Sequence, residues 1–144
     1  STELKKKTEL NYKRNPQDWR KTWVWNGHSI RYAVMNENNR QGPAIVLVHG
    51  FGASADHFRY NLPVLASMGY RTYAIDMLGF GLSDKPTIPN TFSTYGAFVW
   101  MEQIASFIKE IVQSDAYLLG NSLGGYSVLN VAAFYPKLTR GLIL

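Results

Sequence analysis

The sequence predicts an α/β fold, in which helices cover both faces of a mostly parallel sheet and an antiparallel hairpin lies at the N-terminal edge. Short apolar runs at residues 44–48 and 116–119 are typical of buried strands, and residues 71–75 are predicted to form another buried strand between them. Longer segments separate these three predicted strands, and connections of that length join parallel strands. A chain of 144 residues is expected to form one domain.

The hairpin is predicted from alternation and from a turn signal. Residues 20–25 alternate between polar and apolar side chains, and Asn26-Gly27 favours a tight turn. Residues 28–35 then form the return strand, and an asparagine-rich loop leads through Gly42-Pro43 to the first buried strand.

Helices are predicted between and after the buried strands. Residues 55–68 form the first, with Ser54 as its N-cap and Pro63 as a local disturbance. A long loop at residues 76–89 precedes a second helix at residues 95–112, where apolar side chains recur at helical spacing. A third helix is expected at residues 123–135, and residues 141–144 open a further strand.

Composition excludes several classes of protein. Hydrophobic residues make up 46% of the chain, which is typical of a packed globular domain. There is no cysteine, so disulfides, thiolate zinc sites and cysteine nucleophiles are excluded, and a reducing, cytoplasmic location is expected. No apolar run is long enough to span a membrane, and we expect neither a metal nor a cofactor.

The net charge of +5 comes from the first 40 residues, because residues 41–144 carry equal numbers of basic and acidic side chains. We interpret residues 1–19 as a basic, polar leader. Such a leader suits peripheral contact with an anionic membrane surface, and it also suits a solvated segment before an edge strand. Nucleic acid is not an expected partner, since basic residues do not recur along the rest of the chain.

The main chemical motif is Gly120-Asn121-Ser122-Leu123-Gly124, which matches G-x-S-x-G between a predicted strand and a predicted helix. This context defines a nucleophile elbow, in which a sharp turn with positive φ at the serine presents its hydroxyl. The two glycines are expected to avoid collisions with the neighbouring strand and helix. Ser122 is therefore the candidate catalytic nucleophile, and the amide of Leu123 at the helix N-terminus is a candidate oxyanion donor.

A second motif, His49-Gly50-Phe51-Gly52, directly follows a buried strand. Its glycines let the backbone approach a reacting carbon, so the amide of Phe51 is the second candidate oxyanion donor. The Phe51 side chain is also a candidate substrate contact. We expect His49 to hold this loop by hydrogen bonds instead of acting as a base, and Asp76 to brace the glycine-rich loop that follows it.

These motifs, together with residues 74–84, resemble the N-terminal half of the α/β-hydrolase fold. The resemblance covers roughly residues 20–144, which we interpret as the N-terminal portion of one such domain. The elbow is similar to that of pheophytinase and chlorophyll dephytylase, and also to that of bacterial C–C bond hydrolases. Haloalkane dehalogenases and epoxide hydrolases share the framework but have aspartate at the elbow, so Ser122 argues against both.

The resemblance implies a serine hydrolase that acts on a carboxylic ester or related carbonyl compound, with a small, lipophilic ester as its partner. A C–C bond hydrolase and a non-catalytic binding or assembly protein are the alternatives. In this fold the triad acid and histidine follow the serine along the chain, and residues 123–144 contain no Asp, Glu or His. We therefore expect a fragment that carries the nucleophile, needs a C-terminal half and is inactive alone.

Overall fold

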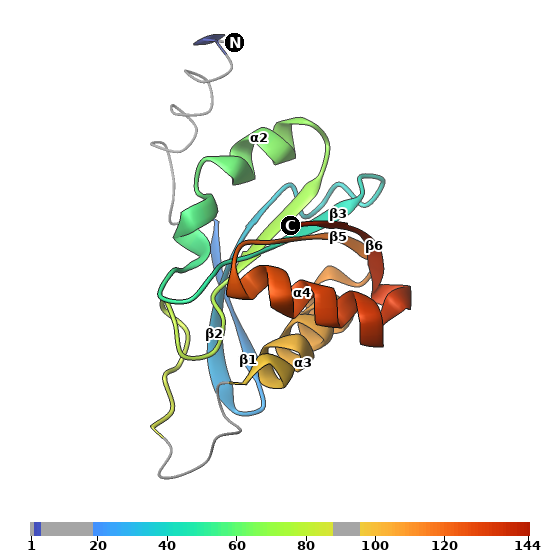
Figure 1. Cartoon of the computed structure of the whole chain (residues 1–144). Coiled ribbons are helices and arrows are strands. Elements are labelled where there is room, and N and C mark those ends of the chain that lie inside the picture. Colours follow the sequence, from blue (N-terminus) through green and yellow to red (C-terminus); the bar gives the residue numbers. More distant parts are fainter. Residues whose placement is uncertain (1, 4–18, 88–95) are drawn as a thin grey trace.

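The structure is a computed structural model that describes residues 2–3, 19–87 and 96–144. Its centre is a six-stranded sheet with the order β1-β2-β4-β3-β5-β6 (Figure 1). The strands are β1 (Arg20–Trp25), β2 (His28–Met35), β3 (Ala44–Val48), β4 (Arg71–Ile75), β5 (Ala116–Gly120) and β6 (Thr139–Ile143). The helices are η1 (Ala55–Phe58), α2 (Asn61–Ser67), α3 (Ala97–Phe107), η2 (Ile108–Val112), α4 (Leu123–Phe134) and η3 (Pro136–Leu138).

Strand directions confirm the predicted fold class. β1 pairs antiparallel with β2, and β2 pairs antiparallel with β4. The remaining neighbours, β4 with β3, β3 with β5 and β5 with β6, are all parallel. A mostly parallel sheet with an antiparallel hairpin at its N-terminal edge follows, as the sequence predicts.

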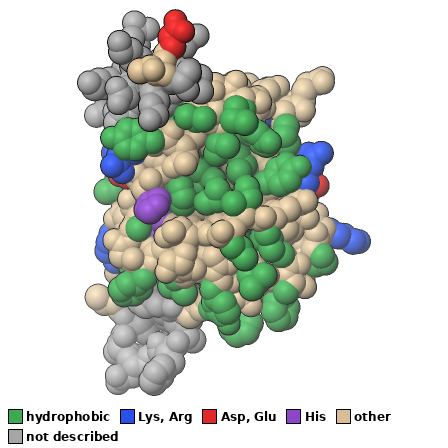
Figure 2. Space-filling view, turned by 45° about the horizontal axis from the view of Figure 1, so that its top comes forward, with side chains coloured by type: hydrophobic (Ala, Val, Ile, Leu, Met, Phe, Trp, Pro, Cys, Tyr) green, Lys and Arg blue, Asp and Glu red, His purple; other side chains and the backbone are tan. Residues whose placement is uncertain are grey.

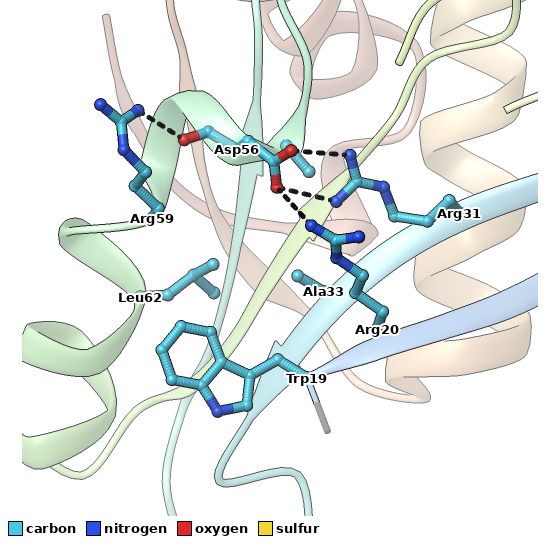
Figure 3. Close-up of a pocket in the computed structure, with 8 residues that line it drawn as sticks. Trp19, Arg20, Arg31, Ala33, Asp56, Arg59 and Leu62 are labelled. Carbon is cyan, nitrogen blue, oxygen red and sulfur yellow. Dashed lines mark hydrogen bonds and ion pairs between the residues drawn. The ribbon is translucent and has the colours of Figure 1, made fainter. Parts of the chain in front are cut away.

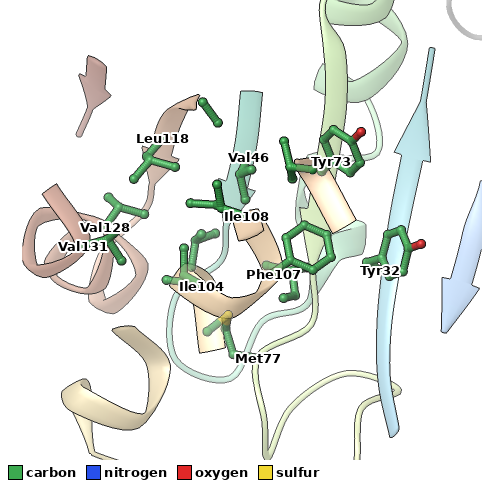
Figure 4. Close-up of a cluster of buried hydrophobic side chains, with 14 of the residues drawn as sticks. Tyr32, Val46, Tyr73, Met77, Ile104, Phe107, Ile108, Leu118, Val128 and Val131 are labelled. Carbon is green, nitrogen blue, oxygen red and sulfur yellow. The ribbon is translucent and has the colours of Figure 1, made fainter. Parts of the chain in front are cut away.

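The larger core lies between the sheet and the helices α3 and α4 (Figure 4). Alternate residues of β3 point into it, because successive side chains of a strand face opposite sides of the sheet. Phe107 of α3 is fully buried, and its ring lies edge-on to Tyr32 at 5.1 Å and to Tyr73 at 5.9 Å between centroids. Aromatic contacts of this kind add about 0.5–1.5 kcal/mol each to the burial of the rings.

The smaller core lies on the opposite face, where Phe58 of η1 and Leu62 of α2 pack against Ile45, Leu47 and Ala74 of the sheet. The described helices therefore cover both faces of the sheet. Figure 2 shows hydrophobic side chains gathered over the face that carries α4 and the end of β6. The exposed ones on these elements and just beyond them are Tyr126, Leu129, Phe134, Leu142, Ile143 and Leu144.

Two predicted helices differ from the structure. The single helix expected at residues 55–68 is divided into η1 and α2, because the ring of Pro63 conflicts with a helical carbonyl four residues earlier, at Arg59. The helix expected at residues 95–112 changes at Ile108 from an α-helix into a π-helical turn, which ends at Gln113 in the left-handed region. Residue 95 lies outside the described residues.

Smaller differences occur at the other ends. β5 and β6 begin or end within two residues of the predicted bounds, and α4 stops at Phe134. The basic leader falls almost entirely on residues 4–18, outside the described part of the chain, so its membrane contact stays a prediction. Within the described ranges, no helix is long and apolar enough to cross a membrane.

Candidate functional site

The candidate site lies at the carboxyl ends of the parallel strands. The register places Val48, the last residue of β3, beside Ile75 of β4 on one side and Gly120 of β5 on the other. The residues that follow these three strands therefore emerge at one edge of the sheet. Ligands of open α/β sheets bind outside this edge.

Ser122 occupies the apex of the sharp turn between β5 and α4. Its φ of 56° and ψ of −120° confirm the predicted positive φ, a conformation that costs a non-glycine residue about 1–3 kcal/mol. Serine at a helix N-cap normally accepts a hydrogen bond from the first turn, yet the Ser122 side chain makes no such bond. Its residue is exposed, so the turn presents a free hydroxyl to solvent.

Two glycines make this turn possible. A Cβ on Gly120 would lie 2.4 Å from the carbonyl oxygen of Gly124. A Cβ on Gly124 would lie 2.3 Å from the carbonyl oxygen of Val48. The first residues of α4 thus pack directly on the backbones of β5 and β3, which confirms the reason expected for both glycines.

His49 fixes the direction of the next peptide bond. The amide of Met77 donates to its Nε2 at 3.0 Å, so Nε2 is the unprotonated nitrogen and Nδ1 carries the proton. Nδ1 then donates to the carbonyl oxygen of Gly50 at 2.7 Å. Both ring nitrogens are engaged, which confirms that His49 holds the loop and leaves it without a nitrogen for proton transfer.

The same contact orients the amide of Phe51. In a trans peptide the N–H points opposite to the C=O, so a Gly50 carbonyl held toward His49 directs the Phe51 N–H away from that ring. Gly50 also lies against the elbow, since a Cβ placed on it would be 3.1 Å from Cβ of Ser122. The structure thus brings the Phe51 segment next to Ser122, while the convergence of the Phe51 and Leu123 amides on one oxygen stays a prediction.

Aromatic side chains continue from this loop into the core. The Phe51 ring is 79% exposed and lies edge-on to Phe80, with 5.3 Å between centroids. Phe80 in turn contacts the buried rings of His49 and Trp100. Phe51 is therefore the aromatic residue of this set that is available to a ligand, whereas Trp100 belongs to the core.

Asp76 braces the glycine-rich loop, as predicted. Its buried carboxylate accepts hydrogen bonds from the amide of Leu82 at 2.7 Å and from the amide of Ala55 at 2.6 Å. Two buried partners of Asp76 were not predicted from the sequence: Nε of Arg31 donates to its carboxylate, and Nε2 of Gln103 donates to its backbone carbonyl. A polar residue in a strand or helix does not by itself reveal its partner.

Burial lowers the pKa of His49 from its ordinary value of 6.5, against the opposing effect of its bond to Gly50. The unfolded chain then binds a proton first as the pH falls below about 6.5. The contribution of neutral His49 to the free energy of unfolding should therefore be fully present above that pH. Below it, this contribution should fall by at most about 1.4 kcal/mol per pH unit. His49→Gln should flatten this slope in urea titrations between pH 7 and 5. Equal slopes for wild type and His49→Gln would contradict the neutral, buried state of His49.

Among the described residues, no group of three or more His, Cys, Asp or Glu side chains could hold a metal ion. What the described edge offers is an exposed hydroxyl on a strained turn, the N-terminus of a 12-residue helix behind it, and a glycine-rich loop beside it.

A strand, a serine-bearing turn and a helix at the carboxyl edge of a mostly parallel sheet define a class of α/β proteins, and sequence comparison identifies the family. A sequence model described as the alpha/beta hydrolase fold matches residues 43–144. The chain belongs to this family.

Individual relatives agree with this assignment. Bifunctional epoxide hydrolase 2 of Sus scrofa is 37% identical over 101 residues, which cover 70% of this chain and 18% of that protein. Chloroplastic pheophytinase of Arabidopsis thaliana is 29% identical, over 80% of this chain and 29% of that protein. The crystal structure of a membrane phospholipase A matches with a TM-score of 0.78 and 25% identity, over 94% of this chain and 44% of that one. The chain thus spans less than half the length of each.

Proposed function

We propose that this chain carries the nucleophile and the oxyanion hole of a serine hydrolase that cleaves a carboxylic ester or a related carbonyl compound. The proposal rests on the state of Ser122. This residue is the N-cap of α4, has a positive φ and is exposed, and its hydroxyl makes no capping hydrogen bond. Hydrolase relatives in the same family support the reaction class.

In the proposed reaction, Oγ of Ser122 attacks the ester carbonyl carbon, and the electrons of the C=O π bond move to the carbonyl oxygen, which gains negative charge. Collapse of this intermediate breaks the C–O bond to the alcohol, which leaves with a proton from the base, and water then hydrolyses the acyl ester of Ser122. The amides of Leu123 and Phe51 stabilise that oxygen, aided by the dipole of α4. A base must accept the hydroxyl proton, and His49 cannot do so because both of its nitrogens are engaged. We place the base and its orienting acid outside residues 1–144, because residues 123–144 contain no Asp, Glu or His.

The proposed substrate is lipophilic. Phe51 offers an exposed aromatic ring on the segment that carries one of the proposed oxyanion donors. Pheophytinase and phospholipase A act on pheophytin and on phospholipid, as their names state, and both compounds carry long hydrocarbon chains. These names support an ester with an apolar chain next to Phe51.

Similarity to an epoxide hydrolase does not favour epoxide opening here. A serine hydroxyl occupies the elbow, where the resemblance implies aspartate for epoxide hydrolases and haloalkane dehalogenases. A C–C bond hydrolase would use the same serine, and a binding protein would not need its reactivity.

Labelling with a fluorophosphonate tests the proposal, since this reagent forms a covalent phosphonyl ester with an activated serine. The native protein at its full length should gain one adduct, located on Ser122 by peptide mass spectrometry. Ser122→Ala should abolish the adduct. Ser127→Ala should not, because the Ser127 hydroxyl is buried and donates to the Leu123 carbonyl. A full-length protein without any adduct would favour the binding-protein alternative.

A further inference from the structure

The segment that carries the Phe51 amide, residues 50–54, is anchored at both ends by hydrogen bonds to two consecutive residues, Asp76 and Met77. Its first end follows His49, whose Nε2 accepts the amide of Met77 at 3.0 Å. Its last end precedes Ala55, whose amide donates to Oδ1 of Asp76 at 2.6 Å. Residues far apart in sequence, at 49–55 and 76–77, therefore form one clamp beside Ser122.

Asp76 is the charged member of this clamp. Its carboxylate is fully buried and accepts three bonds, from the amide of Ala55, from the amide of Leu82 and from Nε of Arg31. The two shortest, from Ala55 and Arg31, are both 2.6 Å. Gly81 packs so closely that a Cβ there would lie 2.2 Å from Oδ2. A buried charge with fully paired oxygens holds its partners in place, because any displacement leaves it unpaired.

Arg31 extends the clamp to η1. While its Nε binds Asp76, Nη1 lies 3.0 Å and Nη2 3.4 Å from the carboxylate oxygens of Asp56 (Figure 3). Arg31 is 5% exposed, whereas the Asp56 side chain faces solvent on one side. One guanidinium thus connects β2, the start of η1 and the loop after β4.

We propose that Asp76 and Arg31 are positioning residues that set the orientation of the Phe51 amide toward the oxyanion of a substrate bound at Ser122. The inference rests on the proposed function. Neither side chain contacts Ser122 in the structure, so both act through residues 50–55. The amide of Ala53 donates to the Gly50 carbonyl at 3.2 Å. Because that carbonyl and the Phe51 amide belong to one peptide group, this hydrogen bond depends on the orientation of the Phe51 amide.

The test compares Asp76→Asn, Arg31→Lys and Asp84→Asn in the native protein at its full length. Asparagine keeps the shape of Asp76 but removes its charge and places an NH₂ against the Ala55 amide, or against the Leu82 amide and Nε of Arg31. Lysine cannot bind Asp76 and Asp56 with the planar fork of Arg31. Asp84 is the matched control, because it tethers the same loop to β2 through the amide of Ser29 at 2.7 Å and makes no bond to residues 50–55.

Kinetics are measured per reactive serine, with the fluorophosphonate used as an active-site titrant. Asp76→Asn should lower kcat for a p-nitrophenyl ester about 10- to 100-fold with KM within about threefold, since loss of one oxyanion donor costs about 10²–10³ and a misplaced one less. Arg31→Lys should lower kcat to a smaller extent, and Asp84→Asn should keep the wild-type kcat. A merely structural role would reduce the titrated fraction and leave kcat per site unchanged, which would overturn the proposal.

Amide hydrogen exchange of Ala53 gives a second readout that needs no activity. Exchange should become at least about tenfold faster in Asp76→Asn and Arg31→Lys but not in Asp84→Asn. If Asp76→Asn does not fold, Arg31→Lys and Asp56→Asn decide the question by both readouts. If the wild type lacks a reactive serine, the proposed function fails. Ala53 exchange still tests the positioning role in that case, because equal exchange rates in the wild type, Asp76→Asn and Arg31→Lys would contradict it.

Discussion

Replacing Ser122 by alanine should lower kcat for a p-nitrophenyl ester by about 10⁴- to 10⁶-fold in the native protein at its full length, the range seen when a triad member is removed from a serine protease. The physical reason is that the hydroxyl is the attacking group, while the oxyanion hole and substrate binding persist without it. KM should change little, because Ser122 adds little to binding of the ground state. Steady-state kinetics with a short-chain and a long-chain ester measure both constants.

Ser127→Ala is the control for this loss, since it removes a buried serine hydroxyl of α4 and leaves the Ser122 hydroxyl in place. Residues 1–144 by themselves should show little turnover, because the oxyanion hole alone leaves roughly 10³–10⁴-fold over water in dissected proteases. A fully active 1–144 chain would mean that one of its own histidines serves as base. An unaffected Ser122→Ala variant would remove the serine mechanism.

Gly124→Ala is expected to destabilise the fold strongly. The new Cβ would lie 2.3 Å from the carbonyl oxygen of Val48 and 2.4 Å from that of His49. Both atoms belong to the backbone at the end of the central strand β3, so neither can move without disturbing the sheet. We expect a loss of about 3 kcal/mol or more in the free energy of unfolding, at or beyond the upper end of ordinary overpacking. Urea unfolding followed by tryptophan fluorescence measures it.

Gly125→Ala provides a matched control one residue further along α4. Its Cβ would meet Gly120 at 3.2 Å, a mild contact, and alanine gains about 1 kcal/mol of helix propensity over glycine. This variant should change the free energy of unfolding by less than about 1 kcal/mol. Equal losses for the two variants would show that the close approach of α4 to β3 is not what requires glycine at position 124.

Much of the fold could be predicted because the decisive signals are local. The apolar run at β3 is continuous, and such a run indicates a strand buried on both faces. Asn26-Gly27 fixed the hairpin turn for the same reason, since a type of turn depends on its own residues. Pro63 indicated a disturbance in the helix predicted at residues 55–68. The complete division into η1 and α2 depended on how η1 packs on the sheet.

The parts of the candidate site that were predicted from the sequence are those that belong to its local motifs. The spacing of Gly120, Ser122 and Gly124 predicts the elbow, and the structure confirms the positive φ of Ser122 and the collisions that require the glycines. The family membership follows from the same local patterns. By itself, then, the sequence determined the strand–turn–helix that presents Ser122.

Only the tertiary structure decided what holds that site together. Arg31, Asp56 and Asp76 lie on three segments separated by 20 or more residues, and they meet because β2 and β4 pair antiparallel while η1 packs beside them. A single buried arginine in a strand gives no sign of which carboxylate it binds. Hydrogen bonds between distant segments depend on the register of the sheet, and that register is set by the packing of the whole core rather than by any stretch of the chain.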